Sequence, residues 1–150
     1  MIVTSVPFAF ASDIVASGEC GKDGDNLTWT LDSAGTLTIS GEGAMAEYDK
    51  LDMPEYGYFL PPWESYKENI KAIVIEEGVT ELGTFAFYKH TAVKDVTIAD
   101  SVSDIKARGF GGCSAIEKLI IPAGISVLEG TAFQDCSSLK QIVFLGPSKF

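Results

Sequence analysis

Apolar residues recur every 23 positions through the C-terminal half of the chain. Residues 70–92, 93–115 and 116–138 align without an insertion, and a fourth segment begins at residue 139. In each segment the first, fourth and sixth residues are apolar, and a phenylalanine follows later at a fixed position. The aligned columns include Ile70/Val93/Ile116/Leu139, Ile73/Val96/Leu119/Ile142, Ile75/Ile98/Ile121/Phe144 and Phe87/Phe110/Phe133. One such segment cannot bury its own apolar face, so the period predicts stacked repeats.

Each repeat is expected to contain one short strand. Its fourth and sixth residues alternate with a residue that faces the other way, which is the side-chain period of a strand. Equivalent strands of successive repeats should lie about 4.8 Å apart and pair in parallel. The spacing of apolar positions 1, 4 and 6 is typical of leucine-rich repeats. We therefore predict an α/β-type repeat solenoid with a 23-residue period and parallel strands.

The N-terminal third does not follow this period. Residues 26–40, NLTWTLDSAGTLTIS, alternate polar and apolar side chains on both sides of a turn, which predicts a β-hairpin. The next residues are rich in Gly, Pro and aromatic side chains, and Pro62 suits the start of a helical turn from about Trp63 to Asn69. Because the terminal repeat of a solenoid needs a cover, we expect a cap with Trp29 and Trp63 as buried anchors.

Three regions follow from these patterns. Residues 1–16 are read as a partial signal peptide and N-terminal tail, because an apolar run ends in Ala9-Phe10-Ala11. No Lys or Arg precedes Lys22, so the basic start of such a signal would lie upstream, and an ordinary apolar strand is the alternative. Residues 17–69 form the cap, and residues 70–150 form three full repeats and a partial one. We expect an exported protein, extracellular or displayed on the cell surface.

Charge and cysteine content narrow the classes of partner. The net charge is −10 in 150 residues, which disfavours nucleic acid and anionic membranes because both need a basic footprint. No apolar run approaches the roughly 18–20 residues that span a bilayer. Three cysteines without a C-x-x-C pair predict neither a disulfide scaffold nor a zinc ribbon.

Four stretches of the chain resemble the BspA-type leucine-rich repeat proteins of bacterial cell surfaces. CSSLKQIVF and IEEGVTELGTFAFYKH look like the repeat unit, and SGECGKDGDNLTWTLDSAGTLTISGEGAM followed by PPWESYKENIKAIVIEEGVTELG looks like the N-terminal capping region. The resemblance covers roughly residues 17–144. It implies an exported protein whose repeat domain is not an enzyme and which serves in adhesion or protein binding. Two departures are His90, in the column of Cys113 and Cys136, and Lys106 and Glu129, in the column of Gly83.

The cysteine column offers the first candidate chemistry. Cys113 and Cys136 should lie about 5 Å apart, within reach of a disulfide, but their Cβ vectors point the same way. Buried free thiols are therefore favoured over a disulfide, and no histidine next to either in sequence supports a catalytic thiol. His90 occupies the same column and is read as a polar variant, with a Cys-His dyad as the alternative. Cys20 has no assignable partner.

Other polar groups carry weaker signals. Asp23, Asp25 and Asn26 faintly resemble the start of a calcium loop, but the later Gly and Glu are missing, so a polar turn is favoured. Asn26-Leu27-Thr28 also fits a glycosylation sequon. Six acids could in principle supply a pair for glycosidic cleavage, although a solvated face is the simpler reading. They are Glu76, Glu77, Glu81, Asp95, Asp100 and Asp104. We predict no catalytic, cofactor-binding or metal-binding residue.

Two surfaces are candidates for binding a partner. The outward strand residue of each repeat is Val74, Thr97, Ile120 and Val143 in turn, and exposed apolar stripes usually mark interfaces, unless neighbouring side chains or the cap shield them. The segment 48–63 carries aromatic residues typical of protein hot spots and of sugar-stacking platforms, with core filling as the alternative. They are Tyr48, Tyr56, Tyr58, Phe59 and Trp63.

The function we expect is a secreted or surface-displayed, non-catalytic module for protein binding or adhesion. The alternative is a carbohydrate-binding module that uses Tyr56, Tyr58 and Trp63. The sequence does not identify the partner, which could also be a glycan. We further expect self-association through the last coil, burying Ile142, Phe144 and the edge at Phe133.

Overall fold

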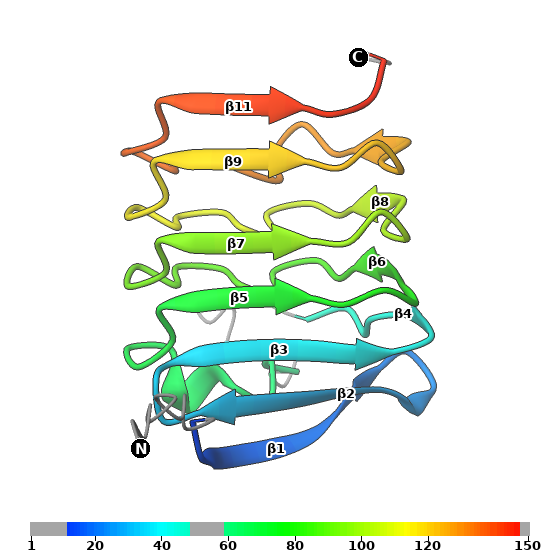
Figure 1. The fold of residues 1–150 in the computed structure, drawn as a ribbon, viewed down its shortest axis with the longest axis vertical. Helices are drawn as coiled ribbons and strands as arrows, with labels where there is room; N and C mark the ends of the chain where they lie inside the picture. The colour runs from blue at the N-terminus through cyan, green and yellow to red at the C-terminus, as the bar shows by residue number, and fades with distance from the viewer. Residues whose placement is uncertain (1–11, 49–58, 148–150) are drawn as a thin grey trace, which may run out of the picture.

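The computed structural model describes residues 12–48 and 59–147, which form a column of stacked coils (Figure 1). The strands are β1 (Ile14–Gly21), β2 (Gly24–Asp32), β3 (Thr36–Gly41), β4 (Gly43–Ala44), β5 (Ala72–Ile75), β6 (Val79–Leu82), β7 (Asp95–Ile98), β8 (Asp104–Ile105), β9 (Lys118–Ile121), β10 (Val127–Leu128) and β11 (Gln141–Phe144). The one helical element in these ranges is the 3-10 turn η2 (Glu64–Tyr66). This is the leucine-rich repeat fold, built from strands.

The expected α/β character is wrong for the described residues, which contain no α-helix. Each coil returns from its strand through tight turns, and Phe85, Lys89, Arg108 and Asp135 adopt positive φ there. Left-handed backbone interrupts any right-handed helix, so the return limbs remain turns. The helical turn expected over residues 63–69 is limited to η2.

Strands line two opposite walls of the column (Figure 1). On one wall β1, β2, β3, β5 and β7 form a sheet in that order, and β9 pairs with β11 in a separate sheet. On the other wall the order is β10-β8-β6-β4. Within the repeats all pairs are parallel, and Ile73 pairs with Val96 while Leu119 pairs with Ile142. Both pairs join residues of one sequence column, so the apolar columns lie stacked along the core.

Antiparallel strands form the N-terminal end of the column. β2 and β3 pair around residues 33–35, where the sequence predicts a hairpin, with Leu31 opposite Leu37. Asp32 holds this turn, because its Oδ1 accepts the amides of Ala34 at 3.0 Å and Thr36 at 2.9 Å. β3 then pairs in parallel with β5, which connects the antiparallel strands to the first repeat. Ile14 to Ala16, assigned above to the N-terminal tail, form the start of β1.

An aromatic stack runs through the core along the column. Phe87 lies 5.0 Å from Phe110, and Phe110 lies 5.5 Å from Phe133, between ring centroids. Trp63 extends the stack at its N-terminal end, 5.5 Å from Phe87 with nearly parallel rings. Trp63, Phe87 and Phe110 are fully buried, whereas Phe133 in the last coil is half-buried. The stack therefore joins the aromatic N-terminal segment to the coils of Phe87, Phe110 and Phe133.

Close packing explains why the first repeat has a glycine, Gly83, where the next two repeats have Lys106 and Glu129. A Cβ atom at residue 83 would lie 1.9 Å from the carbonyl oxygen of Ala46. Ala46 belongs to the N-terminal segment that follows β4, and this segment runs beside the first repeat through the bond from the Met45 amide to the Glu81 carbonyl. The coils of Lys106 and Glu129 adjoin other repeats, so side chains are accommodated there.

Candidate functional site

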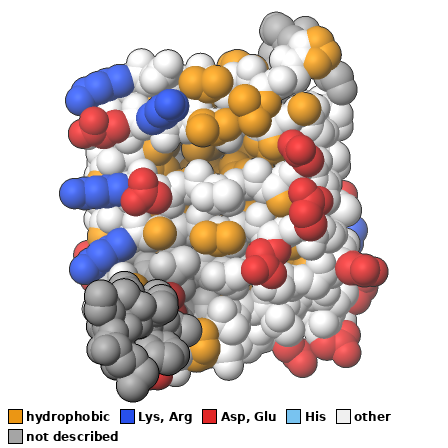
Figure 2. Space-filling model, in the orientation of Figure 1, with side chains coloured by type: hydrophobic (Ala, Val, Ile, Leu, Met, Phe, Trp, Pro, Cys, Tyr) orange, Lys and Arg blue, Asp and Glu red, His pale blue; other side chains and the backbone are white. Residues whose placement is uncertain are grey.

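The four outward strand residues differ in exposure. Thr97 and Ile120 are exposed, and Ile120 retains 43% of its surface. Val74 and Val143 are half-buried, so of these four residues only Ile120 is both apolar and exposed, and the expected stripe is reduced to this position. Figure 2 shows apolar side chains gathered on this face, with mixed charges along one border and acidic side chains along the other.

The sheet on this face is interrupted between β7 and β9. No ladder joins these two strands, although β5 pairs with β7 and β9 pairs with β11 (Figure 1). Before each strand, the amides of Lys94 and Lys140 donate to the carbonyls of Lys71 and Glu117, at 2.9 and 2.8 Å. The amide of Glu117 makes no such bond to Lys94. We call this interval, between residues 94–100 and 115–122, the β7–β9 gap.

One cause of the gap can be read from the chain. After the strands, the amides of Ala99 and Leu145 donate to the carbonyls of Ile75 and Ile121, at 3.1 and 3.0 Å. The corresponding residue of the third repeat is Pro122, which has no amide hydrogen. The third coil therefore lacks the bond that would hold the end of β9 against β7.

The opposite wall stays closed at the same level. Val127 and Leu128 of β10 pair with Asp104 and Ile105 of β8. The amide of Glu129 also donates to the Ile105 carbonyl, at 3.1 Å. The two coils are therefore unpaired at β7 and β9 but remain hydrogen-bonded at β8 and β10.

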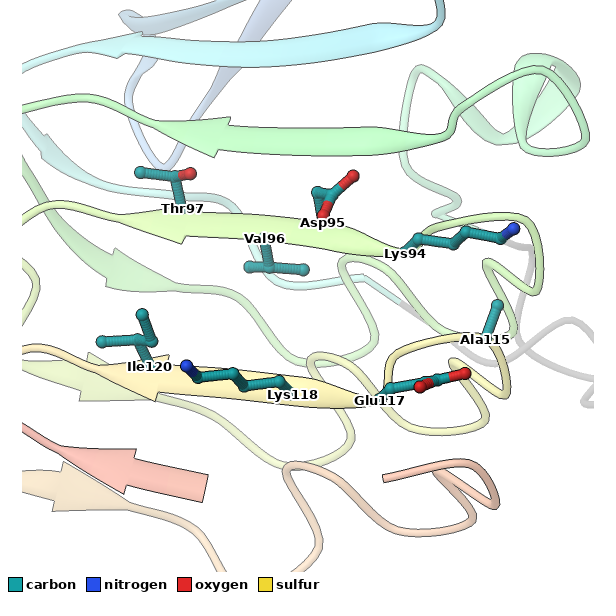
Figure 3. A pocket seen from close by; sticks show the side chains of 8 residues that line it. All are labelled: Lys94, Asp95, Val96, Thr97, Ala115, Glu117, Lys118 and Ile120. Atoms are coloured by element: carbon teal, nitrogen blue, oxygen red, sulfur yellow. The ribbon is translucent and has the colours of Figure 1, made fainter. Parts of the chain in front are cut away.

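The gap exposes part of an inward column. Ile73 and Leu119 are fully buried, but Val96, which lies between them in sequence register, is half-buried. Two adjoining hollows of about 410 and 360 Å³ share Val96, Thr97 and Ile120 in their linings. Figure 3 shows Val96 and Ile120 directed from their strands into the interval between β7 and β9. The result is a groove along the strand direction with an apolar centre.

The aromatic segment is only partly described. Tyr56 and Tyr58 lie outside the described residues. Phe59 is 57% exposed and its ring stacks on Tyr48 at 5.5 Å. Trp63 is fully buried, its Nε1–H donates to the Ala86 carbonyl at 3.0 Å, and its ring packs edge-on against Trp29. Trp63 is thus a core residue in this structure and presents no open ring face to a sugar.

The cysteines are scaffold residues. All three are free. The Sγ of Cys113 donates to the Phe87 carbonyl at 3.1 Å, and that of Cys136 donates to the Phe110 carbonyl at 3.2 Å. Burial raises the pKa of Cys113 and of Cys20 to about 12, and it also raises the pKa of Cys136. Because the nucleophile is the thiolate, these protonated thiols are inert at neutral pH.

His90 is buried, and it occupies in the first repeat the position that Cys113 and Cys136 occupy in the next two. Its Nδ1 lies 3.2 Å from the Tyr88 carbonyl and must carry the proton, since a carbonyl only accepts. Its Nε2 has no partner among the described residues. Burial lowers the pKa of His90, and the bond to Tyr88 only partly offsets this effect. His90 therefore belongs to the core as a neutral imidazole.

His90→Cys should reduce the loss of stability at acidic pH. The folded-state pKa lies below the unfolded value of about 6.5, so the unfolded chain takes up the proton first as the pH falls. Stability from the neutral imidazole is complete above that pH and declines below it, by at most about 1.4 kcal/mol per pH unit. Urea unfolding between pH 7.5 and 5 should show a shallower decline for the variant. Parallel curves for the two proteins would contradict this account.

Asn26 is used within the N-terminal segment. Its Oδ1 accepts the Asp23 amide at 3.0 Å, and its Nδ2 donates to the carbonyls of Glu42 and Ala44, at 3.1 and 3.0 Å. A glycan on Nδ2 would break one of these bonds, so the sequon match does not fit this packing. Within residues 12–48 and 59–147, no group of three His, Cys, Asp or Glu residues could hold a metal ion.

Most of the candidate acids bond within the scaffold. Glu76 accepts the Ser40 hydroxyl at 2.6 Å, and Glu77 accepts the Asp100 amide at 3.0 Å. Glu81 lies 3.6 Å from Lys106, and Asp104 accepts the hydroxyl of Ser103. Asp95 and Asp100 are exposed. These contacts mostly link neighbouring coils, and of the six acids Glu77 and Asp100 both line the hollow of about 360 Å³.

The part of the chain that the structure describes has no helix long and apolar enough to cross a membrane. A comparison with curated protein sequences found no match. Among solved structures, the chain is similar to a leucine-rich repeat protein from Eubacterium ventriosum, with a TM-score of 0.57 and 19% identity. That alignment covers 86% of this chain but only 44% of the relative, so this chain spans less than half of that relative's length.

A leucine-rich repeat protein from Bacteroides capillosus is also similar, with a TM-score of 0.50, 16% identity, and coverage of 81% of this chain and 95% of that one. Identities this low show the fold alone. The family model described as a BspA type leucine rich repeat region (6 copies) matches residues 65–149. Because that match covers more than half of the chain, this protein belongs to the BspA-type leucine-rich repeat family.

Proposed function

We propose that this protein is a secreted or surface-displayed module that binds another protein through its strand face, without catalysis. The observation that carries the proposal is the groove at the β7–β9 gap, where Ile120 is exposed and Val96 is reached by solvent. Exposed apolar surface is costly in water, and on a small protein it usually marks an interface. The family membership supports the same reading, because leucine-rich repeats commonly serve as interaction scaffolds.

The chemistry of the described residues agrees with binding more than with turnover. The thiols of Cys20 and Cys113 are protonated by burial, and the imidazole of His90 is enclosed in the core. Glu76, Glu77 and Glu81 are engaged in contacts with the neighbouring coil or strand. What remains accessible is apolar surface bordered by charge, which suits a macromolecular partner.

A capture experiment tests this function. The intact protein and Ile120→Lys are immobilised, incubated with surface-protein extracts and crosslinked, and the contact sites are mapped by mass spectrometry. We expect captured proteins whose crosslinks fall on residues 94–100 and 115–122, and we expect their loss with Ile120→Lys. Ile14→Lys, which changes an exposed isoleucine on β1, should retain them. Capture that is equal for all three proteins would contradict the proposal.

A carbohydrate-binding module is the second candidate, and one observation favours it. The exposed Phe59 ring stacks on Tyr48 beside a hollow of about 440 Å³, and aromatic rings of this kind stack on sugars. A glycan array separates the two functions. A silent array supports protein binding, whereas a signal that disappears with Phe59→Ala supports sugar binding.

We also propose that the antiparallel strands act as the N-terminal cap of a solenoid with a 23-residue period. Leu37 of β3 pairs with Ile73, and the Trp63 ring continues the phenylalanine stack, so backbone and core both extend from the repeats into this segment. The strand pairs of the repeats join residues 23 positions apart, as Ile73 and Val96 do. A cap of this kind covers the open end of the first repeat.

Self-association through the last coil is expected as well. β11 is an edge strand, and Ile142 and Phe144, which occupy inward columns, are 41% and 43% exposed. A second copy laid edge to edge would bury both side chains. Light scattering at tens of micromolar should report a dimer or larger species for the intact chain and a monomer for Ile142→Lys, whereas Ile14→Lys should still associate. A strict monomer for the intact chain would contradict the expectation.

A further inference from the structure

We propose that the β7–β9 gap admits an extended segment of a partner polypeptide, which enters as an additional strand with apolar side chains and a basic residue. This inference rests on the proposed protein-binding function and specifies its site and the chemistry of its partner. The occupant is a peptide segment because the gap offers backbone groups together with an apolar centre.

The backbone groups are the first argument. β7 pairs with β5 on one side and β9 pairs with β11 on the other, so the edges that face each other across the gap carry no ladder. Open strand edges recognise extended chains by main-chain hydrogen bonds, as in β-strand addition. Here two such edges face the same interval, so one inserted segment can bond to both.

The gap must widen before it can hold an inserted strand. Some Cα atoms of β7 and β9 lie within 8 Å of each other. A strand paired on both sides needs its neighbours about 9.6 Å apart, twice the spacing of paired strands. Insertion therefore widens the gap further, while the bonds between β8 and β10 and the stack of Phe110 on Phe133 hold the coils together on the closed side.

The side chains in the gap set the preference for apolar residues. Val96 lies in an inward column and is half-buried, and Ile120 is exposed on the neighbouring strand. Figure 3 shows both directed into the interval. Apolar side chains of the inserted segment would cover Val96 on the core side and Ile120 on the outer side, because strand side chains alternate between the two faces.

Charge favours a basic residue at the end where the strands finish. Glu77 and Asp100 line the hollow at that end, beside Pro122 and Leu145. At the opposite end, Lys94 and Lys118 are balanced by Asp95 and Glu117. The whole chain carries a net charge of −10, which also favours a basic partner.

The test uses a defined peptide with the full chain. The probe is a fluorescent, acetylated and amidated heptapeptide of alternating Thr and Val with Lys at both ends. One matched control carries N-methyl groups on alternate amides, which removes backbone donors but keeps the side chains. A second control replaces both lysines with glutamate. Binding is measured by fluorescence anisotropy, and amide hydrogen exchange of β7 and β9 is followed with and without the probe.

Two protein variants locate the site. Ile120→Lys places a charge in the gap and should weaken binding by at least about tenfold, or 1.4 kcal/mol. Val74→Lys changes the same column on β5, which has ladders on both sides, and should leave binding within about twofold because no open edge lies there. Both residues lie on the outward face, so the fold should persist.

The expected result is saturable binding that is lost on N-methylation and weakened by glutamate, with slowed exchange in β7 and β9. Absence of saturable binding, or binding that N-methylation or Ile120→Lys leaves unchanged, would overturn the inference. In that case, capture of proteins by the intact chain that is lost with Ile120→Lys would still support the proposed function. Conversely, peptide binding without any captured partner would leave the groove established and the proposed function unsupported.

Discussion

Phe110→Ala should lower the free energy of unfolding by about 3–5 kcal/mol, the range found when a large buried aromatic side chain is truncated. Phe110 is fully buried and its ring stacks on Phe87 and on Phe133. The alanine variant leaves a cavity between two coils, and stacked neighbours joined by strand ladders cannot easily collapse into it. The change removes the coupling between repeats along the core.

Urea unfolding monitored by circular dichroism measures this loss. Phe133→Ala is the matched control, because Phe133 stacks on one ring only and is half-buried in the last coil. Its loss should be clearly smaller, since less apolar surface leaves water on folding. Equal losses for the two variants would show that the stack does not couple the coils as described.

Trp63→Ala should destabilise the fold by a similar amount, about 3–5 kcal/mol. The fully buried ring touches Trp29, Tyr48 and Phe87, so it joins the antiparallel strands to the first repeat. The variant also leaves the Ala86 carbonyl without the indole N–H that bonds to it at 3.0 Å. We expect unfolding to begin at the N-terminal end, with early hydrogen exchange in β3 and β5.

Trp63→Phe separates packing from hydrogen bonding. This variant keeps an aromatic ring but removes the N–H donor. It should lower the free energy of unfolding by about 1–3 kcal/mol, because the Ala86 carbonyl loses its hydrogen bond and the smaller ring leaves volume unfilled. Tyr66→Phe, which keeps the ring against Trp29, should have little effect because Tyr66 is already part exposed. If Trp63→Ala unfolds like the wild type, Trp63 does not anchor this end. A stable Trp63→Ala variant is also required before any loss of sugar binding could be attributed to a site.

The repeat columns were predictable because every coil must bury the same side of its strand. The pairings of Ile73 with Val96 and of Leu119 with Ile142 follow directly from the period in the sequence. Exposure at Val96 was not predictable in this way, because a periodic pattern treats all repeats alike. The one local signal was Pro122, whose missing amide removes a bond that Ala99 and Leu145 make in their coils.

The backbone conformation of the return turns could not be predicted from the sequence either. Phe85 and Lys89 adopt positive φ although neither is a glycine, and only Gly112, in the column of Lys89, signals such a conformation in the sequence. The tertiary bonds from Phe87 to the Gly109 carbonyl and from Lys89 to the Gly111 carbonyl, both at 2.7 Å, hold this turn in place. Contacts between coils therefore hold the left-handed conformation of this turn. The burial of Trp63 was predicted, but its stacking on Phe87 of the first repeat was not, because the period does not extend to residue 63.

The one-sided interruption of the sheet has a mechanical consequence. When the column is pulled along its axis, hydrogen bonds of both walls resist extension between β3 and β5 and between β5 and β7, but between β7 and β9 only the wall of β8 and β10 does so. Tension should therefore bend the molecule about that closed wall and separate these coils before the pairs that are bonded on both walls. A protein displayed on a surface and tethered to a moving partner would open its groove under the load that its partner applies.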